Sequence, residues 1–327
     1  MVKRPTVFVL GAGGSAPYGF PLGGELMQGI QYELLRGATA FRNDLLTAEF
    51  HELALQQFAL ALKASGLYSI DEFLQWHPEH RRLGKLAIAR MLIPAERHDR
   101  LDFGADYKLW LPAGSPDTRW YRYFFNQLLR SRKGRCDLAG NLVTIVTFNF
   151  DRSFERALYL FMQANCGADA IAQVRQIPIY HVHGQLGLPD WISTSTRLSG
   201  HRDYDPRDPG SIPQPSISKA ELRLCADQIR IVDEEVTDSP ILRSALGALE
   251  DAEVVAFLGF SYHPLNLQKL RLEKLQGKDI RGTAYQLPLG PRGAVQKAFD
   301  AAGTKIMLAE PSDHVLTFLE NTDLIFD

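Results

Sequence analysis

A buried-strand pattern that stops at a glycine-rich turn constrains this chain more than any other feature. Residues 6–10, TVFVL, are apolar or β-branched throughout, which is typical of a strand covered on both faces of a parallel sheet. The next residues, GAGGSA at 11–16, fit the pattern G-x-G-x-x-G/A. There the first glycine makes a tight turn, and the second lets the backbone approach a pyrophosphate at a helix start. The stretch predicts a dinucleotide site or, alternatively, a tight strand-to-helix turn with no ligand.

Strand and helix patterns alternate in the second half of the chain. Strands are expected at 142–151, 177–184, 253–260, 282–287 and 304–308, with helices at 152–163, 219–230, 240–250, 265–275 and up to Ala302. Such alternation predicts an α/β fold, a Rossmann-like, doubly wound and mostly parallel sheet. Helical spacing also runs through 22–36, 45–65, 70–91 and 119–132. We therefore expect a single domain over 1–327, with a Rossmann-like part at about 1–30 and 140–327 and a helical insertion at about 30–140.

Charge and composition narrow the classes of partner. The net charge of −2 gives no general attraction to nucleic acid or anionic lipid, and the basic run at 130–135 is typical of a solvated helix end. Direct nucleic-acid binding is therefore not expected. No stretch approaches the roughly 18 apolar residues that a membrane span needs. The chain enters a strand at once without a signal-peptide core, so we expect a cytoplasmic protein with no membrane association.

The cysteines are few and scattered. Cys136, Cys166 and Cys225 form no C-x-x-C pair, so neither a zinc ribbon nor a disulfide framework is expected, and no metal is assigned.

The element after the glycine-rich turn argues against hydride transfer. A dehydrogenase-type site needs an acidic residue about 20 residues on, at the end of a second strand. Residues 26–42 hold only Glu33, within a helical pattern. The turn is suitable for binding a dinucleotide, but the helical pattern that follows it is not typical of a dehydrogenase.

The longer stretch GAGGSAPYGFP, at 11–21, resembles the sirtuin pattern GAG-x-S-x-x-x-G-I-P. Three further motifs follow in the sirtuin order: TFNFD at 147–151 is similar to T-Q-N-I-D, HVHG at 181–184 to H-G, and FLGFSYHPLN at 257–266 stands where sirtuins carry G-T-S. Each lies at the carboxyl end of an expected strand, as one crevice at a sheet switch point requires.

Departures from the pattern point to one branch of that family. Leu22, Gly23 and Gly24 replace the sirtuin D-F-R, and the four-cysteine zinc ribbon of the protein deacylases is absent from the sequence. TFNFD is closer to the S/T-F-N-Y-D of divergent bacterial sirtuin-like domains, which hydrolyse NAD in anti-phage defence. The resemblance implies an NAD+ glycohydrolase with NAD as substrate, gated by homo-oligomerisation or by a protein partner such as a sensor or a translocase ATPase.

The resemblance also implies roles for individual residues. The implied catalytic residues are Asn149, His183 and Asp151; the implied cofactor-binding residues are Gly11, Ala12, Gly13, Ser15, Pro21, Gly259 and Ser261. His183, with a pKa near neutrality, would take a proton from a ribose hydroxyl or water. Asn149 would hold the ribose hydroxyl and the water, and Ser261 would reach the adenosine-side ribose or phosphate. Asp151 would orient the carboxamide or its loop, with Asp190 as the other candidate.

Three of the polar residues near these strand ends have a second interpretation. Asn149 is also a good N-cap for the helix that follows. His183 is also a candidate core histidine, and His181 points the same way along the strand, so only the H-G resemblance favours His183. His263 either ends a strand or joins the site.

Two longer segments, and the activity itself, also have more than one interpretation. WYRYFF at 120–125 serves helix packing or an oligomer interface, and the loop at 199–216 is a lid or a partner-binding segment. The alternative functions are an NAD-dependent protein deacylase and a non-catalytic NAD or ADP-ribose sensor.

Overall fold

A computed structural model describes residues 2–96, 101, 118–129, 137–187, 218–231 and 239–323. The basic run at 130–135, the loop at 199–216 and Asp190 lie outside these residues. The chain divides into two compact units, each formed by separate segments. The first unit consists of Met1–Phe20, Asp99–His183 and Glu235–Asp327, and the second of Pro21–His98 and Gly184–Glu234. The domain boundaries expected from the sequence stay a prediction.

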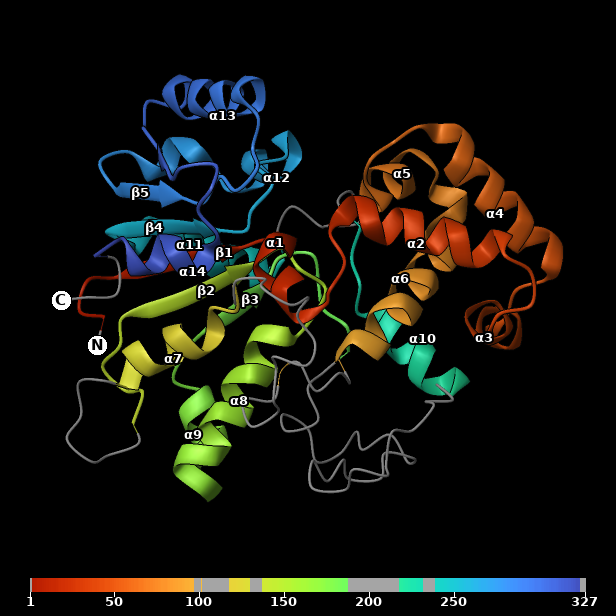
Figure 1. Cartoon of the computed structure of the whole chain (residues 1–327), viewed down its shortest axis with the longest axis horizontal. Helices are drawn as coiled ribbons and strands as arrows, with labels where there is room; N and C mark the ends of the chain where they lie inside the picture. Colours follow the sequence, from red (N-terminus) through yellow and green to blue (C-terminus); the bar gives the residue numbers. More distant parts are fainter. Residues whose placement is uncertain are drawn as a thin grey trace. The chain divides into compact units, whose positions relative to one another are not determined.

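The first unit is built on a six-stranded sheet of order β3-β2-β1-β4-β5-β6, in which every pairing is parallel (Figure 1). The strands are β1 (Thr6–Leu10), β2 (Val143–Thr147), β3 (Ile179–His181), β4 (Val254–Leu258), β5 (Asp279–Gly282) and β6 (Met307–Leu308). β1 lies at the centre, paired with β2 and β4, and its burial on both faces explains its unbroken apolar sequence. This order is that of dinucleotide-binding folds, so the predicted Rossmann-like α/β class is confirmed.

Helices cover both faces of this sheet. The helices of the first unit are α1 (Ala12–Ser15), α7 (Tyr121–Leu129), α8 (Ser153–Cys166), α9 (Ala170–Val174), α11 (Pro240–Asp251), α12 (Pro264–Lys269), α13 (Leu289–Ala301) and α14 (Val315–Glu320). Val7 and Val9 of β1 share a core with Leu249 of α11 and Phe299 of α13. Phe8 points to the other face, where its ring meets Phe124 of α7 at 4.9 Å. The alternating side chains of β1 thus bind the two helical layers together.

The aromatic run at 120–125 is part of the core. Trp120, Tyr121, Phe124 and Phe125 are all buried, and their rings pack edge-on against one another and against Phe154 of α8. The packing interpretation of this run is therefore confirmed.

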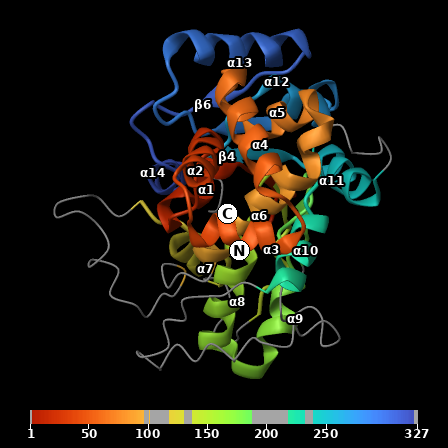
Figure 2. The same cartoon turned by 90° about the vertical axis from the view of Figure 1, so that its right-hand side faces the viewer.

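The second unit is helical. Its helices are α2 (Gly23–Leu35), α3 (Ala40–Ala48), α4 (Glu52–Ser65), α5 (Ile70–Trp76), α6 (Arg81–Glu96) and α10 (Lys219–Asp227). Figures 1 and 2 show α10, which comes from a much later part of the chain, beside α6 and α3. Arg223 of α10 donates from Nη2 to the carbonyl of Ala48 at 2.7 Å and to Glu49 at 2.9 Å, which ties it to the end of α3.

Three expected elements differ from the structure. The helix expected at 45–65 is interrupted between α3 and α4, and the helix expected at 70–91 is interrupted at Pro78, whose ring and missing N–H cannot continue a helix. The strand expected at 282–287 lies earlier, as β5. Its charged Asp279 and Arg281 conceal it, and Gln286, with φ 52°, lies outside any strand conformation.

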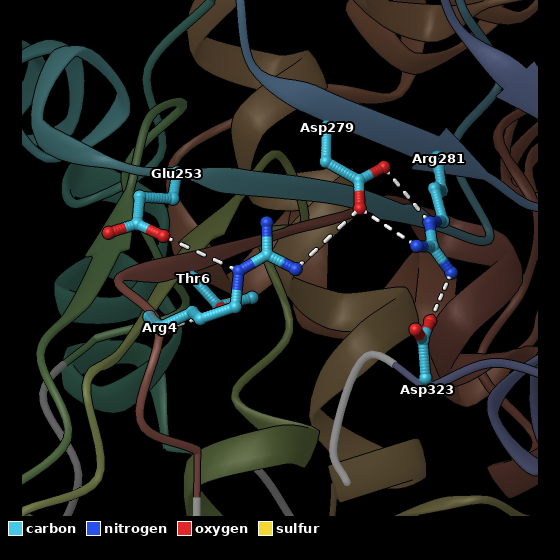
Figure 3. A network of polar contacts seen from close by, with 6 residues as sticks. All are labelled: Arg4, Thr6, Glu253, Asp279, Arg281 and Asp323. Carbon is cyan, nitrogen blue, oxygen red and sulfur yellow. Dashed lines mark hydrogen bonds and ion pairs between the residues drawn. The ribbon is translucent and has the colours of Figure 1, made fainter. Parts of the chain in front are cut away.

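A polar network spans the amino ends of three strands (Figure 3). Arg4 precedes β1 and lies between Glu253, at 3.4 Å, and Asp279, at 3.9 Å. Arg281 of β5 holds Asp279 through two hydrogen bonds of 2.8 and 2.9 Å and also pairs with Asp323 near the end of the described chain. The network lies at the edge of the sheet opposite the glycine-rich turn.

The sequence predicts neither membrane association nor a disulfide framework. No helix in the described part of the chain combines the length and the apolar character that crossing a bilayer requires. Cys225 is buried in the second unit, whereas Cys166 is disulfide-bonded. One disulfide-bonded cysteine is not a disulfide framework, so the expectation that the scattered cysteines form no framework stays a prediction.

Candidate functional site

The four sequence motifs come together at the carboxyl edge of the sheet. The glycine-rich turn follows β1, Asn149 and Asp151 follow β2, His183 follows β3, and Gly259 follows β4. The strand order reverses between β1 and β4, which is where open α/β sheets form a ligand crevice.

The glycines of the turn allow two backbones to touch. The N–H of Gly13 donates to the carbonyl of Gly259 at 2.9 Å, and a Cβ on Gly11 would lie 2.6 Å from the same oxygen. Gly259 adopts φ 59°, and a Cβ there would collide with the backbone nitrogen of Gly14. The glycine pattern thus serves close packing between the ends of β1 and β4. The amide of Gly13 is already used, whereas that of Ala12 has no partner among the described residues.

Asn149 and Asp151 are both directed toward the β1 turn. The Asn149 amide donates from Nδ2 to the carbonyl of Gly11 at 3.1 Å, and the Ser15 hydroxyl donates to Asp151 Oδ2 at 2.9 Å. The other Asp151 oxygen accepts the N–H of Ser153 at 3.0 Å, at the start of α8. The N-cap residue of α8 is Arg152, so the interpretation of Asn149 as the cap of this helix is wrong. The amide oxygen of Asn149 has no partner in the described part of the chain.

His181 is a fully bonded core histidine. One ring nitrogen, Nδ1, lies 3.1 Å from the carbonyl oxygen of Asn149, and the other, Nε2, lies 2.8 Å from Glu155 Oε1. Both side chains are buried. Burial lowers the pKa of His181, but the Glu155 carboxylate, through its charge and its hydrogen bond, outweighs that effect and holds the pKa above its ordinary value.

His183 has the opposite environment. It is 3% exposed, and neither ring nitrogen makes a hydrogen bond of normal geometry to a residue that the structure describes. Its ring lies 5.3 Å from that of Phe148 and 6.2 Å from that of Phe150. Burial, with the positive charge of Lys269, lowers its pKa to about 3, and a longer hydrogen-bonding interaction with the Asn266 side chain acts in the other direction. The pKa is thus well below the near-neutral value expected from the sequence, and His183 is neutral at physiological pH.

The buried ring nitrogens make His183, of the two histidines, the candidate for a ligand contact. Buried polar atoms are nearly always hydrogen-bonded, and leaving one unpaired costs about 1–3 kcal/mol. A ligand hydroxyl at this position would recover that cost. Sequence could not separate His181 from His183. Their bonding within the described chain does, because both nitrogens of His181 make hydrogen bonds of normal geometry and those of His183 make none.

The end of β4 is held by residues that sequence analysis did not identify. Thr283 accepts the N–H of Gly259 at 2.8 Å through its hydroxyl, and its carbonyl accepts the hydroxyl of Tyr262 at 2.9 Å. Tyr262 has φ 57°, a left-handed conformation that is uncommon for an aromatic residue. Ser261, which precedes Tyr262, is exposed. His263 is the N-cap residue of α12, and its carbonyl accepts the N–H groups of two residues in that helix.

Pro21 belongs to the second unit, whereas the other described site residues expected from the sequence belong to the first. Glu155 was missed as well, although its position four residues after Asp151 puts it on the first turn of α8.

A separate cavity of about 540 Å³ lies at the opposite edge of the sheet. It is lined by the amino ends of β1 and β2 and by α11, including Thr6, Asn141 and Ser244. It is therefore distinct from the carboxyl-edge site. Among the described residues, no group of three or more histidine, cysteine or acidic side chains is arranged to hold a metal ion.

Neither a scan against protein-family models nor a search of curated proteins finds a match for this chain.

Proposed function

We propose that the protein is an NAD+ glycohydrolase that cleaves NAD to nicotinamide and ADP-ribose. The observation that carries the proposal is the buried, neutral His183 at the edge where Asn149, Asp151 and the glycine-rich turn meet. Its two nitrogens make no hydrogen bond of normal geometry in the described chain. The order of the four motifs, which resembles that of sirtuins, supplies the identity of the dinucleotide.

Binding draws on the turn after β1 and on Asn149. The free amide of Ala12 suits a phosphate oxygen, because it opens the short helix α1 and has no other partner among the described residues. Asn149 uses its Nδ2 on Gly11, so its amide oxygen is left to accept a hydrogen bond from a ribose hydroxyl or a water. Asp151, held by Ser15 and Ser153, contributes negative charge beside the sugar that becomes cationic.

The reaction adds water across one bond. The water oxygen attacks the anomeric carbon of the ribose while the bond to the nicotinamide nitrogen breaks, and the electron pair of that bond leaves with nicotinamide, which becomes neutral. His183 accepts the proton that the water loses, directly or through a ribose hydroxyl. A weak base exerts little pull on bound water, so we expect the proton to move as the glycosidic bond breaks and not before.

The biological setting is also a proposal. Divergent bacterial sirtuin-like domains deplete NAD in anti-phage defence, and an unregulated NADase would be toxic to its own cell. We therefore infer a cytoplasmic effector, gated by homo-oligomerisation or by a partner such as a sensor or a translocase ATPase. The competing functions are a protein deacylase, which would form O-acyl-ADP-ribose, and a non-catalytic NAD or ADP-ribose sensor.

The test is to incubate the full chain with NAD at low and high protein concentration and to follow nicotinamide and ADP-ribose by chromatography. We expect turnover that Asn149→Ala and His183→Ala abolish, whereas the control His263→Ala retains it. His263 is a suitable control because it caps α12 through its main-chain carbonyl, which the substitution leaves in place.

If the chain alone is inactive, the assay is repeated with the product of the neighbouring gene. Bound NAD without turnover in that complex would refute the hydrolase and favour the sensor. Release of a deacylated peptide with O-acyl-ADP-ribose would favour the deacylase.

A further inference from the structure

A buried histidine and a buried carboxylate lie directly behind the loop that carries Asn149. His181, the last residue of β3, faces the backbone of Asn149 on one side and Glu155 of α8 on the other. His181 is 5% exposed and Glu155 is 6% exposed. Both His181 nitrogens are used inside the protein, so neither is available to a ligand.

The partners of His181 determine where its protons lie. A carbonyl oxygen only accepts hydrogen bonds, so Nδ1 must carry a proton to bond Asn149. Nε2, at 2.8 Å from Glu155, then either donates to an ionised carboxylate or accepts from a protonated one. The pair therefore holds one shared proton between these two groups in addition to the one on Nδ1.

We propose that Glu155 and His181 form a buried ion pair that positions Asn149 for catalysis, an inference that rests on the proposed hydrolase. His181 is a positioning residue, since it acts through the main chain of Asn149. The raised pKa of His181 agrees with the charged form. The acidic groups that influence it are Glu155 of α8 and Asp151 of the loop after β2.

The pair connects three elements at one point. Glu155 lies on the first turn of α8, His181 ends β3, and Asn149 follows β2. On the other side of the loop, the main-chain N–H of Asn149 donates to the Thr147 hydroxyl at 3.1 Å. The side chain of Asn149 donates to the carbonyl of Gly11. The Asn149 side chain can keep its direction only if its backbone is held, and His181 is the side chain that bonds its carbonyl.

The ion pair itself is tested without any activity measurement. Nitrogen-15 NMR of the histidine rings in the full chain at pH 7.5, about one unit above the free value, should show His181 protonated on both nitrogens. In Glu155→Gln only Nδ1 should keep its proton, because a neutral amide no longer stabilises the imidazolium. A singly protonated ring in the unmodified protein would overturn the ion pair.

The positioning role is tested with a double variant, Glu155→Leu with His181→Phe. Replacing a buried pair by apolar side chains of similar volume usually preserves folding, whereas removing one partner leaves a buried charge unpaired. We expect kcat for NAD cleavage to fall about 100-fold with little change in KM, because a displacement near 1 Å has an effect of this size. Glu155→Gln keeps the Nδ1 bond and should lose far less.

A second measurement separates this proposal from the hydrolase itself. Hydrogen exchange of the Asn149 amide should be faster in the double variant by at least about tenfold, while exchange in the central strand β1 stays the same. A protein inactive in every assembly, with this exchange difference present, would refute the hydrolase but leave the positioning intact. Unchanged kcat, or unchanged exchange at Asn149, would refute the positioning.

Discussion

Burial of His183 couples folding to pH at the scale of a single residue. Its folded pKa of about 3 lies below the ordinary value of 6.5. Between these two pH values the histidine is protonated in the unfolded chain and neutral in the folded chain. The stability that results is fully present above pH 6.5 and declines as the pH falls toward 3. Between pH 7 and pH 5 this amounts to about 2 kcal/mol of unfolding free energy.

Urea unfolding of the unmodified protein and of His183→Leu at pH 7 and pH 5 measures the effect. We expect the leucine variant to lose about 2 kcal/mol less over this interval. His181 has a raised pKa, so its contribution is present below pH 6.5 and is lost as the pH rises. That contribution is common to both proteins and cancels in the comparison. Equal losses in the two proteins would contradict the buried, neutral state of His183.

For single residues, the sequence predicts which residue types lie at the strand ends better than it predicts their hydrogen-bond partners and protonation. The motifs place a histidine and an asparagine at two strand ends, and the structure has them there. They could not show that Glu155 satisfies His181, because that contact joins α8 to β3 across 26 residues. They also could not show that Asp151, rather than Asn149, bonds the start of α8, since either side chain fits that role.

The contact between the β1 turn and the end of β4 governs stability at the scale of elements. We expect Gly259→Ala to lower the unfolding free energy by about 2–4 kcal/mol, because its φ of 59° disfavours a side chain and the new Cβ would meet backbone. Chemical denaturation followed by circular dichroism measures the loss. A change below about 1 kcal/mol would mean that the two strand ends are not packed this closely.

Gly247 provides the matched control. It lies inside α11, and a Cβ there meets nothing within 4 Å. Gly247→Ala should therefore raise the unfolding free energy by about 0.5–1 kcal/mol, because alanine restricts the unfolded chain and favours the helix. A destabilised Gly247→Ala would show that the loss in Gly259→Ala is not specific to the strand contact.

Elements with a single strong periodicity were the ones that the sequence located well. β1 has the bounds expected from its apolar run, and α11 begins at its expected proline. β5 was displaced because its charged side chains serve the polar network instead of a core. α10 fitted the expected alternation but belongs to the helical unit, where Arg223 bonds the end of α3. The position of β5 and the unit to which α10 belongs depend on tertiary contacts, and the periodicity of the sequence carries no information about those contacts.

On the scale of the whole molecule, the alternation of strands and helices predicts the fold class but not the strand order. β1 pairs with β2 and with β4, which lies more than 240 residues along the chain. The sheet is therefore assembled from distant segments, and segments near both ends of the chain meet the same network at the amino edge (Figure 3). That network offers a test of how the segments are held together.

Asp279→Asn should lower the unfolding free energy by about 1 kcal/mol, because Arg281 loses a two-point partner and Arg4 loses an opposite charge. The loss should shrink in about 1 M salt, since partly exposed ion pairs are screened. Arg281 also lowers the pKa of Asp323, so that interaction is present above the ordinary carboxylate pKa and is lost as the pH falls below it.

The surface ion pair of Lys274 and Glu250, at 3.8 Å and about half exposed on both sides, is the control for this prediction. Lys274→Ala should change the unfolding free energy by no more than about 0.3 kcal/mol at any salt concentration, because a single exposed pair contributes little. Thermal unfolding of both variants at low and high salt distinguishes a network from an ordinary surface pair. Equal, salt-independent effects would mean that the network does not hold the amino edge of the sheet. A loss confined to Asp279→Asn at low salt would mean that charge at this edge helps to join β1, β5 and the C-terminal segment.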